Sequence, residues 1–137
     1  MEVENMTHYA ICSDDKCYSE VYTKEEIDDM FTTQMYRHVA SDLQFDNKDN
    51  FYYFSGSYDQ PIETYNDTFI PIGVVSNSIT IENSLHQKAP IVSLISELKY
   101  SSNGWYVRLN YSALAPFPMN YTDLDITIYV LFRKKVS

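Results

Sequence analysis

The C-terminal stretch at residues 123–134 alternates its side chains with the two-residue period of a β-strand. One side of this stretch is made of Leu124, Ile126, Ile128, Val130 and Phe132. The other side includes Tyr129 and Leu131, so it is partly apolar as well. A strand with two apolar sides is typical of the centre of a sheet or of an interface. We therefore expect this stretch to be a central or interfacial strand.

Similar short apolar runs, separated by turn residues, begin at about Tyr36. The expected strands are residues 36–43, 50–56, 68–75, 79–82, 90–100, 104–112 and 123–134. Asn103-Gly104 supplies the backbone conformation that a tight hairpin turn needs. Beyond that turn, Trp105, Val107, Leu109 and Tyr111 share one side of a strand. The pattern predicts an all-β fold, with an antiparallel β-sandwich of jelly-roll-like form as a head domain at residues 36–137.

Residues 1–22 form a separate N-terminal unit in this prediction. Two strand-like runs flank the polar stretch at residues 13–16, a pattern that predicts a β-hairpin with Cys12 and Cys17 opposite each other. Opposed residues come close enough for a disulfide, although a chain made in a reducing cytoplasm keeps its thiols free. A zinc site that adds His8 is a third interpretation, and it lacks a fourth local ligand.

A short connector helix is expected at residues 23–35. Thr23 can cap its start, and a glutamate three positions later completes a capping box. Ile27, Met30 and Phe31 would share one face of this helix. So short a helix is marginal in water, and its apolar stripe needs either the head domain or copies of itself from other chains. We therefore expect Ile27, Met30 and Phe31 to form an oligomer contact.

Charge is concentrated in the N-terminal third of the chain. The formal net charge is −9, and residues 1–50 hold 12 acidic against 4 basic side chains. Nucleic-acid binding is disfavoured, because it needs clustered Lys and Arg, and the basic triplet at residues 133–135 fits a solvated strand end. No apolar run reaches the roughly 18 residues of a membrane span, and the N-terminus shows no signal-peptide pattern. We expect no nucleic-acid partner and no membrane insertion.

The side-chain patterns of common enzymes are missing from the sequence. Three glycines stand far apart, so no glycine-rich loop can hold a phosphate. Three histidines are also separated, in no metal or triad spacing. Paired acids such as Glu25-Glu26 resemble glycosidase carboxylates, but acids at a helix start already have a structural reason in the helix dipole. We expect no catalytic residue, no metal and no cofactor, and hence a protein that is not an enzyme.

The chain contains 13 tyrosines. Aromatic rings with a polar tip occur in half-buried strands, in subunit interfaces and on sugar-binding surfaces. Strand packing and subunit contact are the simpler interpretation. Tyr106, Tyr58 and Tyr121 are the candidates for a surface that contacts a receptor.

The segment at residues 21–29, with an aromatic residue followed by Thr, Lys, two acids, Ile and Asp, resembles the joint of bacteriophage virion fibre proteins of the head-fibre, tail-fibre or baseplate type. The hairpin before it and the strand-like run at residues 122–132 are similar to that architecture in outline. The resemblance implies an N-terminal anchor, a short helical joint and a β-rich head that is usually trimeric. It also implies a protein made in the host cytoplasm and located in the virion, where its N-terminal region attaches to other virion proteins. A joint of two or three helical turns would make the chain a short decoration and not a shaft.

Two other functions fit the sequence. A carbohydrate-binding receptor-recognition module would contact host glycans through tyrosines and Trp105. A small acidic inhibitor would mimic DNA with the acids of residues 1–50, although most of these acids fall at turns and at a helix start. Several weakly binding copies attached together bind more tightly than one, so a homo-oligomer also suits attachment to a cell surface.

Overall fold

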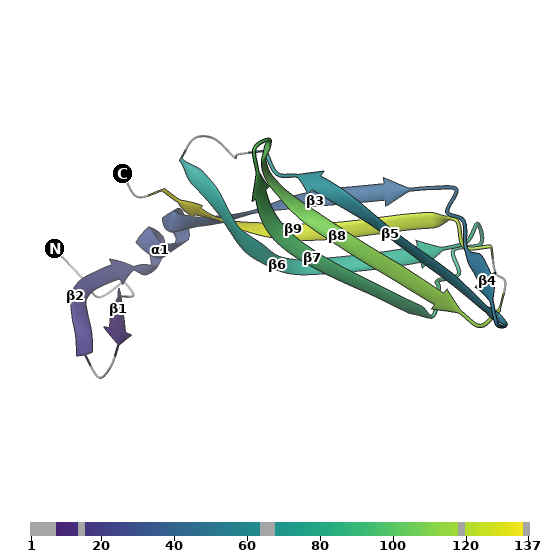
Figure 1. Cartoon of the computed structure of the whole chain (residues 1–137). Coiled ribbons are helices and arrows are strands. Elements are labelled where there is room, and N and C mark those ends of the chain that lie inside the picture. Colours follow the sequence, from purple (N-terminus) through teal and green to yellow (C-terminus); the bar gives the residue numbers. More distant parts are fainter. Residues whose placement is uncertain (1–7, 14–15, 64–67, 118–119, 136–137) are drawn as a thin grey trace.

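The computed structural model describes residues 8–13, 16–63, 68–117 and 120–135, with side chains from Thr23 onward apart from those of Ile27 and Asp28. The elements in chain order are β1 (His8–Ser13), β2 (Lys16–Thr23), α1 (Lys24–Met30), β3 (Phe31–Ala40), β4 (Asp46–Lys48), β5 (Phe51–Pro61), β6 (Phe69–Glu82), β7 (Ile91–Ser101), β8 (Gly104–Ala115) and β9 (Asp123–Lys134). Figure 1 shows an elongated body of strands with the β1–β2 hairpin and α1 at one end.

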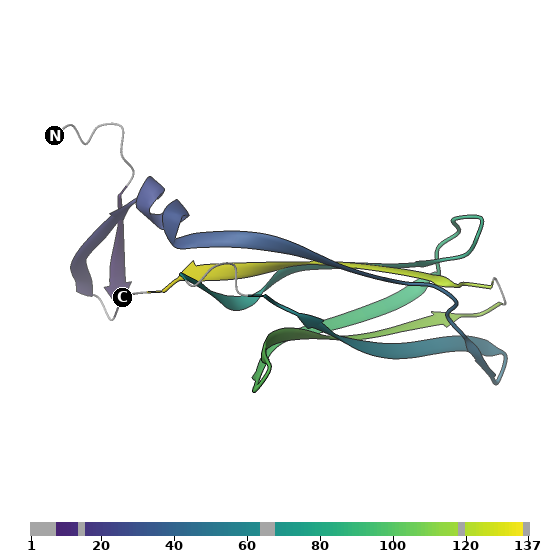
Figure 2. The same cartoon turned by 90° about the horizontal axis from the view of Figure 1, so that it is seen from above.

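Two antiparallel sheets form the body. One sheet has the strand order β3-β9-β6, and the other has the order β4-β5-β8-β7. β1 and β2 form a separate two-stranded sheet. Seen from above, the two larger sheets lie as layers against each other (Figure 2). The expected all-β antiparallel sandwich, with an N-terminal hairpin and one short helix, is confirmed.

β9 is the central strand of the three-stranded sheet, as its two apolar sides predict. Its inward side chains are almost fully buried: Leu124, Ile126, Ile128, Val130 and Phe132. The core also contains the inward side of β8: Val107, Leu109, Tyr111, Ala113 and Ala115. Burying one large apolar side chain is worth about 1.5 to 3 kcal/mol. These two facing strands therefore contribute most of the apolar burial that holds the sheets together.

Gly56 allows β5 to approach the ring of Tyr111. The two residues are paired directly across β5 and β8. A Cβ atom on Gly56 would lie 2.7 Å from Cε2 of the Tyr111 ring. The ring occupies the space that a side chain on β5 would fill, and its centroid lies 6.0 Å from that of Phe54. Packing therefore requires glycine at this position.

The β7–β8 hairpin has the turn that its sequence predicts. Ser101 pairs with Gly104 across the turn. Gly104 has a φ of 109°, which residues with a side chain rarely adopt. The backbone N–H of Asn103 donates a hydrogen bond to Oγ of Ser101 at 3.2 Å. The positive φ expected at Asn103-Gly104 is therefore found at the glycine.

The helix is shorter than expected, and Phe31 lies outside it. α1 ends at Met30, and β3 begins at the next residue and pairs with β9 along its whole length. Ile27, Met30 and Phe31 therefore do not share a helix face, and residues 31–35 are strand. The reason is that Phe31 and the two threonines after it favour extended backbone and gain a complete ladder with β9, which a local helix cannot supply.

The start of α1 agrees with the prediction. Oγ1 of Thr23 accepts a hydrogen bond from the backbone N–H of Glu26 at 3.0 Å. Thr23 itself is buried, with an exposed fraction of 3%. The cap satisfies one of the free N–H groups of the first turn and fixes where the chain leaves β2.

β6 is a single strand of 14 residues, whereas the sequence pattern predicts two strands there. Its register with β9 shifts between Pro71 and Gly73 and again between Val74 and Ser76. Each extra residue at a bulge shifts the alternation of inward and outward side chains by one position. A search for a period of two therefore does not recognise the strand as continuous. β4 is also absent from the prediction, because its three residues carry no apolar alternation.

Within the N-terminal hairpin, Cys12 and Cys17 are direct partners across β1 and β2. This register agrees with the expected pairing of the two positions. Their side chains, and residues 14–15 of the turn, lie outside the described residues. The disulfide, the free thiols and the zinc site with His8 therefore stay predictions.

Side chains also join the two sheets along both sides of the sandwich. On one side, Nδ2 of Asn77 on β6 donates a hydrogen bond to Oγ of Ser96 on β7 at 3.0 Å. On the other side, the ring of His38 on β3 stacks on that of Tyr58 on β5, with centroids 3.8 Å apart and planes at 9°. These contacts fix the sheets relative to each other where no backbone ladder connects them.

We call the end of the sandwich away from α1 the distal end. The connections β3–β4, β4–β5, β6–β7 and β8–β9 meet there (Figures 1 and 2). Every described non-glycine residue with a positive φ lies in one of these connections: Asp42, Asp49, Asn50, His86 and Asn120. Asp and Asn tolerate this backbone conformation better than other residues with side chains. The distal connections are thus tightly turned.

Candidate functional site

The described residues hold no convergent set of catalytic groups. In the part of the chain that the structure describes, no group of three or more His, Cys, Asp or Glu side chains could hold a metal ion. His86 meets Glu82 at 3.3 Å, but its side chain is 84% exposed, so nothing there excludes water from a reaction. No described helix is long and apolar enough to cross a membrane. The surfaces of the sandwich are therefore the candidates for function.

The outward side of the β3-β9-β6 sheet carries an apolar surface, which we call the outer apolar face: Phe31, Met35, Val39, Tyr129 and Leu131. On β3, Phe31, Met35 and Val39 are 36%, 56% and 58% exposed. Tyr129 on β9 is 40% exposed and directly opposes Met35. Arg37 separates Val39 from Met35 along the strand, but apolar side chains that stay half exposed together on one side of a sheet are typical of interaction surfaces.

β3 is an edge strand of this sheet. It pairs with β9 along one side, and no other described strand pairs with its second side. Its N–H and C=O groups on that side are available to a strand from elsewhere. Many proteins protect such edges with Lys, Pro or a bulge. β3 contains neither Lys nor Pro, its register with β9 has no shift, and its charged residue Arg37 is paired with Asp125. The edge therefore continues the outer apolar face as a surface suited to association.

One ion pair lies within the outer apolar face. Nε and Nη2 of Arg37 donate hydrogen bonds to Oδ1 and Oδ2 of Asp125 at 2.9 and 2.6 Å. These hydrogen bonds from the guanidinium lower the pKa of Asp125 below its usual value. Arg133 directly opposes Phe31 at the α1 end of the face, but the charges of Arg37 and Asp125 neutralise each other, so this pair adds little net charge beside Val39. A second copy of the same face would meet no strong repulsion there.

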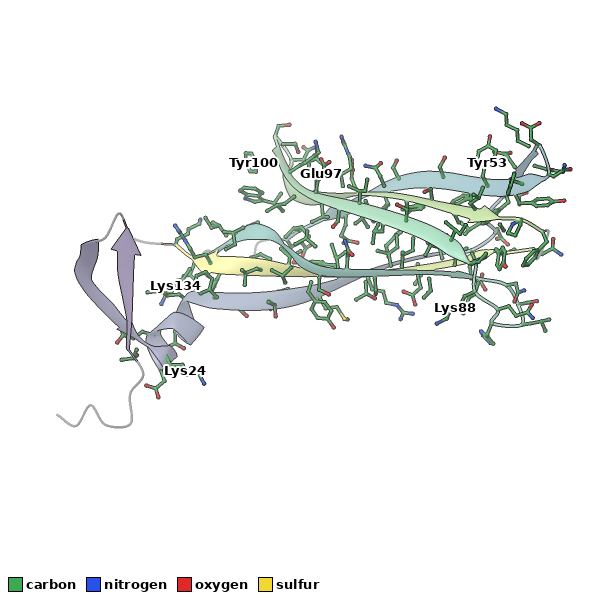
Figure 3. All side chains as sticks on the ribbon, turned by 90° about the horizontal axis from the view of Figure 1, so that it is seen from below. Lys24, Tyr53, Lys88, Glu97, Tyr100 and Lys134 are labelled. Carbon is green, nitrogen blue, oxygen red and sulfur yellow. The ribbon has the colours of Figure 1, made fainter. Side chains whose placement is uncertain are left out.

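Charges of both signs lie at the α1 end of the sandwich. Glu25, Glu26 and Asp29 on α1 are exposed, as is the basic triplet at residues 133–135 at the end of β9. Figure 3 shows Lys134 and Lys24 at this same end. Met30 is half-buried, and the side chain of Ile27 lies outside the described residues. The oligomer contact expected at Ile27, Met30 and Phe31 stays a prediction, with Phe31 now part of the outer apolar face.

The outward side of the other sheet is polar around Tyr106 and partly apolar towards the distal end, where Tyr53, Leu114 and Ile91 are direct neighbours across three strands. Tyr106 lies on β8, with the Cζ atom of Arg108 5.6 Å from its ring centroid. Arg108 also donates hydrogen bonds to Oδ1 and Oδ2 of Asp59 at 3.0 and 3.3 Å, which lower the pKa of Asp59. Small hydroxyl side chains, Ser55, Ser112 and Ser93, form the next part of this surface across three strands. This sheet also exposes apolar side chains, with Ile91 and Ile95 on β7 55% and 57% exposed.

Tyr58 and Tyr121 occupy two other places. Tyr58 stacks on His38 between the sheets, and burial lowers the pKa of His38 below its usual value. Tyr121 is only 5% exposed and lies at the distal end, with its ring centroid 5.8 Å from that of Phe45. The structure thus does not bring Tyr106, Tyr58 and Tyr121 together. Their role in receptor contact stays a prediction for each residue separately.

Sequence reasoning missed Met35 and Val39. Met35 is the last residue of the expected helix, and Val39 lies in the first expected strand. The sequence around them does not indicate that their side chains stay exposed to water. The available signal was the partly apolar second side of residues 123–134, which includes Tyr129 and Leu131. Only the strand register shows that Met35 lies beside Tyr129.

No protein-family model, no curated protein and no solved structure matches this chain.

Proposed function

We propose that the protein is a non-enzymatic structural component of a bacteriophage virion, a short head or tail fibre or decoration protein that forms a homotrimer. The N-terminal region attaches to other virion proteins, and the sandwich faces outward. The observation that carries the proposal is the outer apolar face, because a single chain leaves Met35 and Val39 more than half exposed to water. Covering such a face is favourable through the hydrophobic effect.

The edge of β3 supports association between copies. A surface that combines half-exposed apolar residues with an unprotected strand edge is a hazard for a monomer, because it pairs with other chains. In a protein that assembles, the same surface becomes the interface. The Arg37–Asp125 ion pair has no net charge. Two or more copies can therefore bring this part of the face together without repulsion.

The charges at the α1 end favour a parallel arrangement of the copies. If copies stand side by side with their helices at the same end, the acids of α1 in one copy face the basic residues 133–135 of a neighbour. Opposite charges across an interface guide association and fix its register. The number of three copies, and membership of a virion, come from the resemblance of residues 21–29 to the joint of fibre proteins. In such an assembly the sandwich heads act together, and their binding gains by avidity.

Virion membership is tested by the genes beside this one and by the composition of purified particles. The proposal predicts neighbouring genes for capsid or tail proteins, and peptides of this chain in particles that have been purified through a density gradient. Peptides found only in the soluble fraction of infected cells, together with neighbours unrelated to particle assembly, would refute it.

A further inference from the structure

The distal end contains a pocket of about 330 Å³, which we call the distal pocket. Three parts of the chain line it: the β3–β4 connection, the start of β5, and the β8–β9 connection. The lining residues are Leu43, Gln44, Phe45, Tyr52, Phe117, Asn120, Tyr121 and Thr122. This volume lies at the lower end of the range for small-molecule sites, so the pocket suits one ring and not an extended ligand.

The inner part of the distal pocket is held in place before any ligand arrives. The backbone N–H of Leu43 donates a hydrogen bond to the carbonyl oxygen of Thr122 at 3.1 Å, which ties two of the lining segments together. The Phe45 ring lies 5.6 Å from that of Phe54 and 5.8 Å from that of Tyr121, measured between centroids. Aromatic rings packed in this way form a rigid apolar wall.

The rim of the distal pocket is exposed and uncharged. Phe117 is 47% exposed, and Gln44 and Asn120 are exposed as well. Amide side chains both donate and accept hydrogen bonds, which suits a ligand whose hydroxyl groups do the same. No residue that lines the pocket carries a charge.

Three acidic residues are sequence neighbours of residues that line the distal pocket. Asp42, Asp46 and Asp123 each adjoin a lining residue in the sequence, and each is exposed. No cationic side chain lines the pocket to pair with an anionic ligand, and carboxylates near the lining segments disfavour such a ligand, whereas a neutral ligand is unaffected. The ligand should therefore be uncharged, carry several hydroxyl groups, and present an apolar side to aromatic rings.

We propose that the distal pocket binds the pyranose ring of a neutral saccharide. One side of a pyranose ring is largely C–H and packs on an aromatic ring, while its hydroxyl groups meet the amides of Gln44 and Asn120. The pocket is built within one chain, so this proposal does not depend on self-association or on virion membership. It also places binding at the distal end, away from the N-terminal hairpin (Figure 1).

The test is a titration of the ¹⁵N-labelled full chain, followed by two-dimensional NMR. The probes are the methyl glycosides of glucose, galactose and N-acetylglucosamine, with the methyl glycoside of N-acetylneuraminic acid as the anionic comparison. At least one neutral probe should bind with a dissociation constant of about 1 mM, the value expected for a ligand of this size. Its shift changes should be confined to residues 43–45, 52, 117 and 120–122, and the anionic probe should produce none.

Two rim variants and one matched control locate the site. Phe117→Ala and Gln44→Ala change exposed side chains, so the fold should persist and the spectra away from the pocket should be unchanged. Each variant should weaken binding at least fivefold. Tyr100→Ala removes another exposed aromatic ring, 68% exposed against 47% for Phe117, at the other end of the sheet from Tyr53 (Figure 3), and should bind as the unmodified chain does. Unchanged spectra with every neutral probe, or equal affinity in Phe117→Ala, would overturn the proposal.

Discussion

Removing two side chains from the outer apolar face should weaken self-association and leave the fold intact. Met35 and Val39 are 56% and 58% exposed in one chain. Full burial of such a side chain is worth about 1.5 to 3 kcal/mol, so burying the exposed half of each in an interface is worth about 0.8 to 1.5 kcal/mol. The double replacement Met35→Ala and Val39→Ala should therefore cost about 1.5 to 3 kcal/mol for each contact made by the face. That cost corresponds to a dissociation constant about 10- to 150-fold higher.

Sedimentation equilibrium over a range of concentrations measures this change. The matched control is the double replacement Ile91→Ala and Ile95→Ala on the outward side of β7, where the two side chains are 55% and 57% exposed. The chain with the two control replacements should dissociate at the same concentration as the unmodified chain. Both double variants should unfold near the same temperature. Equal weakening in the two pairs, or no weakening in the β3 pair, would refute the assignment of the interface to the outer apolar face.

Three further substitutions test the fold and its ionisable groups. Gly56→Ala should lower the free energy of unfolding by about 1 to 3 kcal/mol, because its Cβ would collide with an aromatic ring, whereas Gly73→Ala, with nothing within 4 Å of its Cβ, should cost less in the same urea titration. Thr23→Ala should speed hydrogen exchange at the amide of Glu26, whose hydrogen bond it removes, and equal exchange in the two chains would contradict the cap. Burial lowers the pKa of His38 below 6.5, so the unfolded chain takes up a proton first and stability should decrease as the pH falls from 6.5 towards the lowered pKa. His38→Gln should remove that decrease, and an unchanged pH profile would exclude His38 as its cause.

The strands that form the core could be predicted from the sequence. The side chains of β9 and β8 alternate between the core and the outward side without interruption, because neither strand contains a bulge. The period of two therefore continues from Leu124 to Phe132. The turn at Gly104 was predictable for a local reason as well, since its positive φ of 109° favours glycine.

Features that depend on partners distant in the sequence could not be predicted. The preference of Phe31 and the next two threonines for extended backbone is weak by itself, and the strand that replaces the rest of the expected helix exists because β9 supplies its ladder. The bulges of β6 interrupt the alternation of its side chains, so the sequence pattern predicts two strands where the structure has one. β4 exists through its pairing with β5 and carries no apolar pattern of its own.

The candidate surfaces were only partly predictable for the same reason. A central strand with a partly apolar second side indicates an interface, and Tyr129 lies on that side. The position of Met35 beside it depends on the register of β3. The distal pocket combines two connections with the start of β5, and nothing local in the sequence indicates that Phe45 and Tyr121 meet.

The native mass of the intact chain tests the central claim, self-association of a structural protein, most directly. Native mass spectrometry and light scattering should both find a species of three times the 16.0 kDa chain mass. That species should dissociate on dilution, because the apolar area that each copy contributes is modest. A single species at the mass of one chain, at concentrations up to about 100 μM, would contradict the account. It would mean that the dissociation constant of any self-association is larger than about 100 μM.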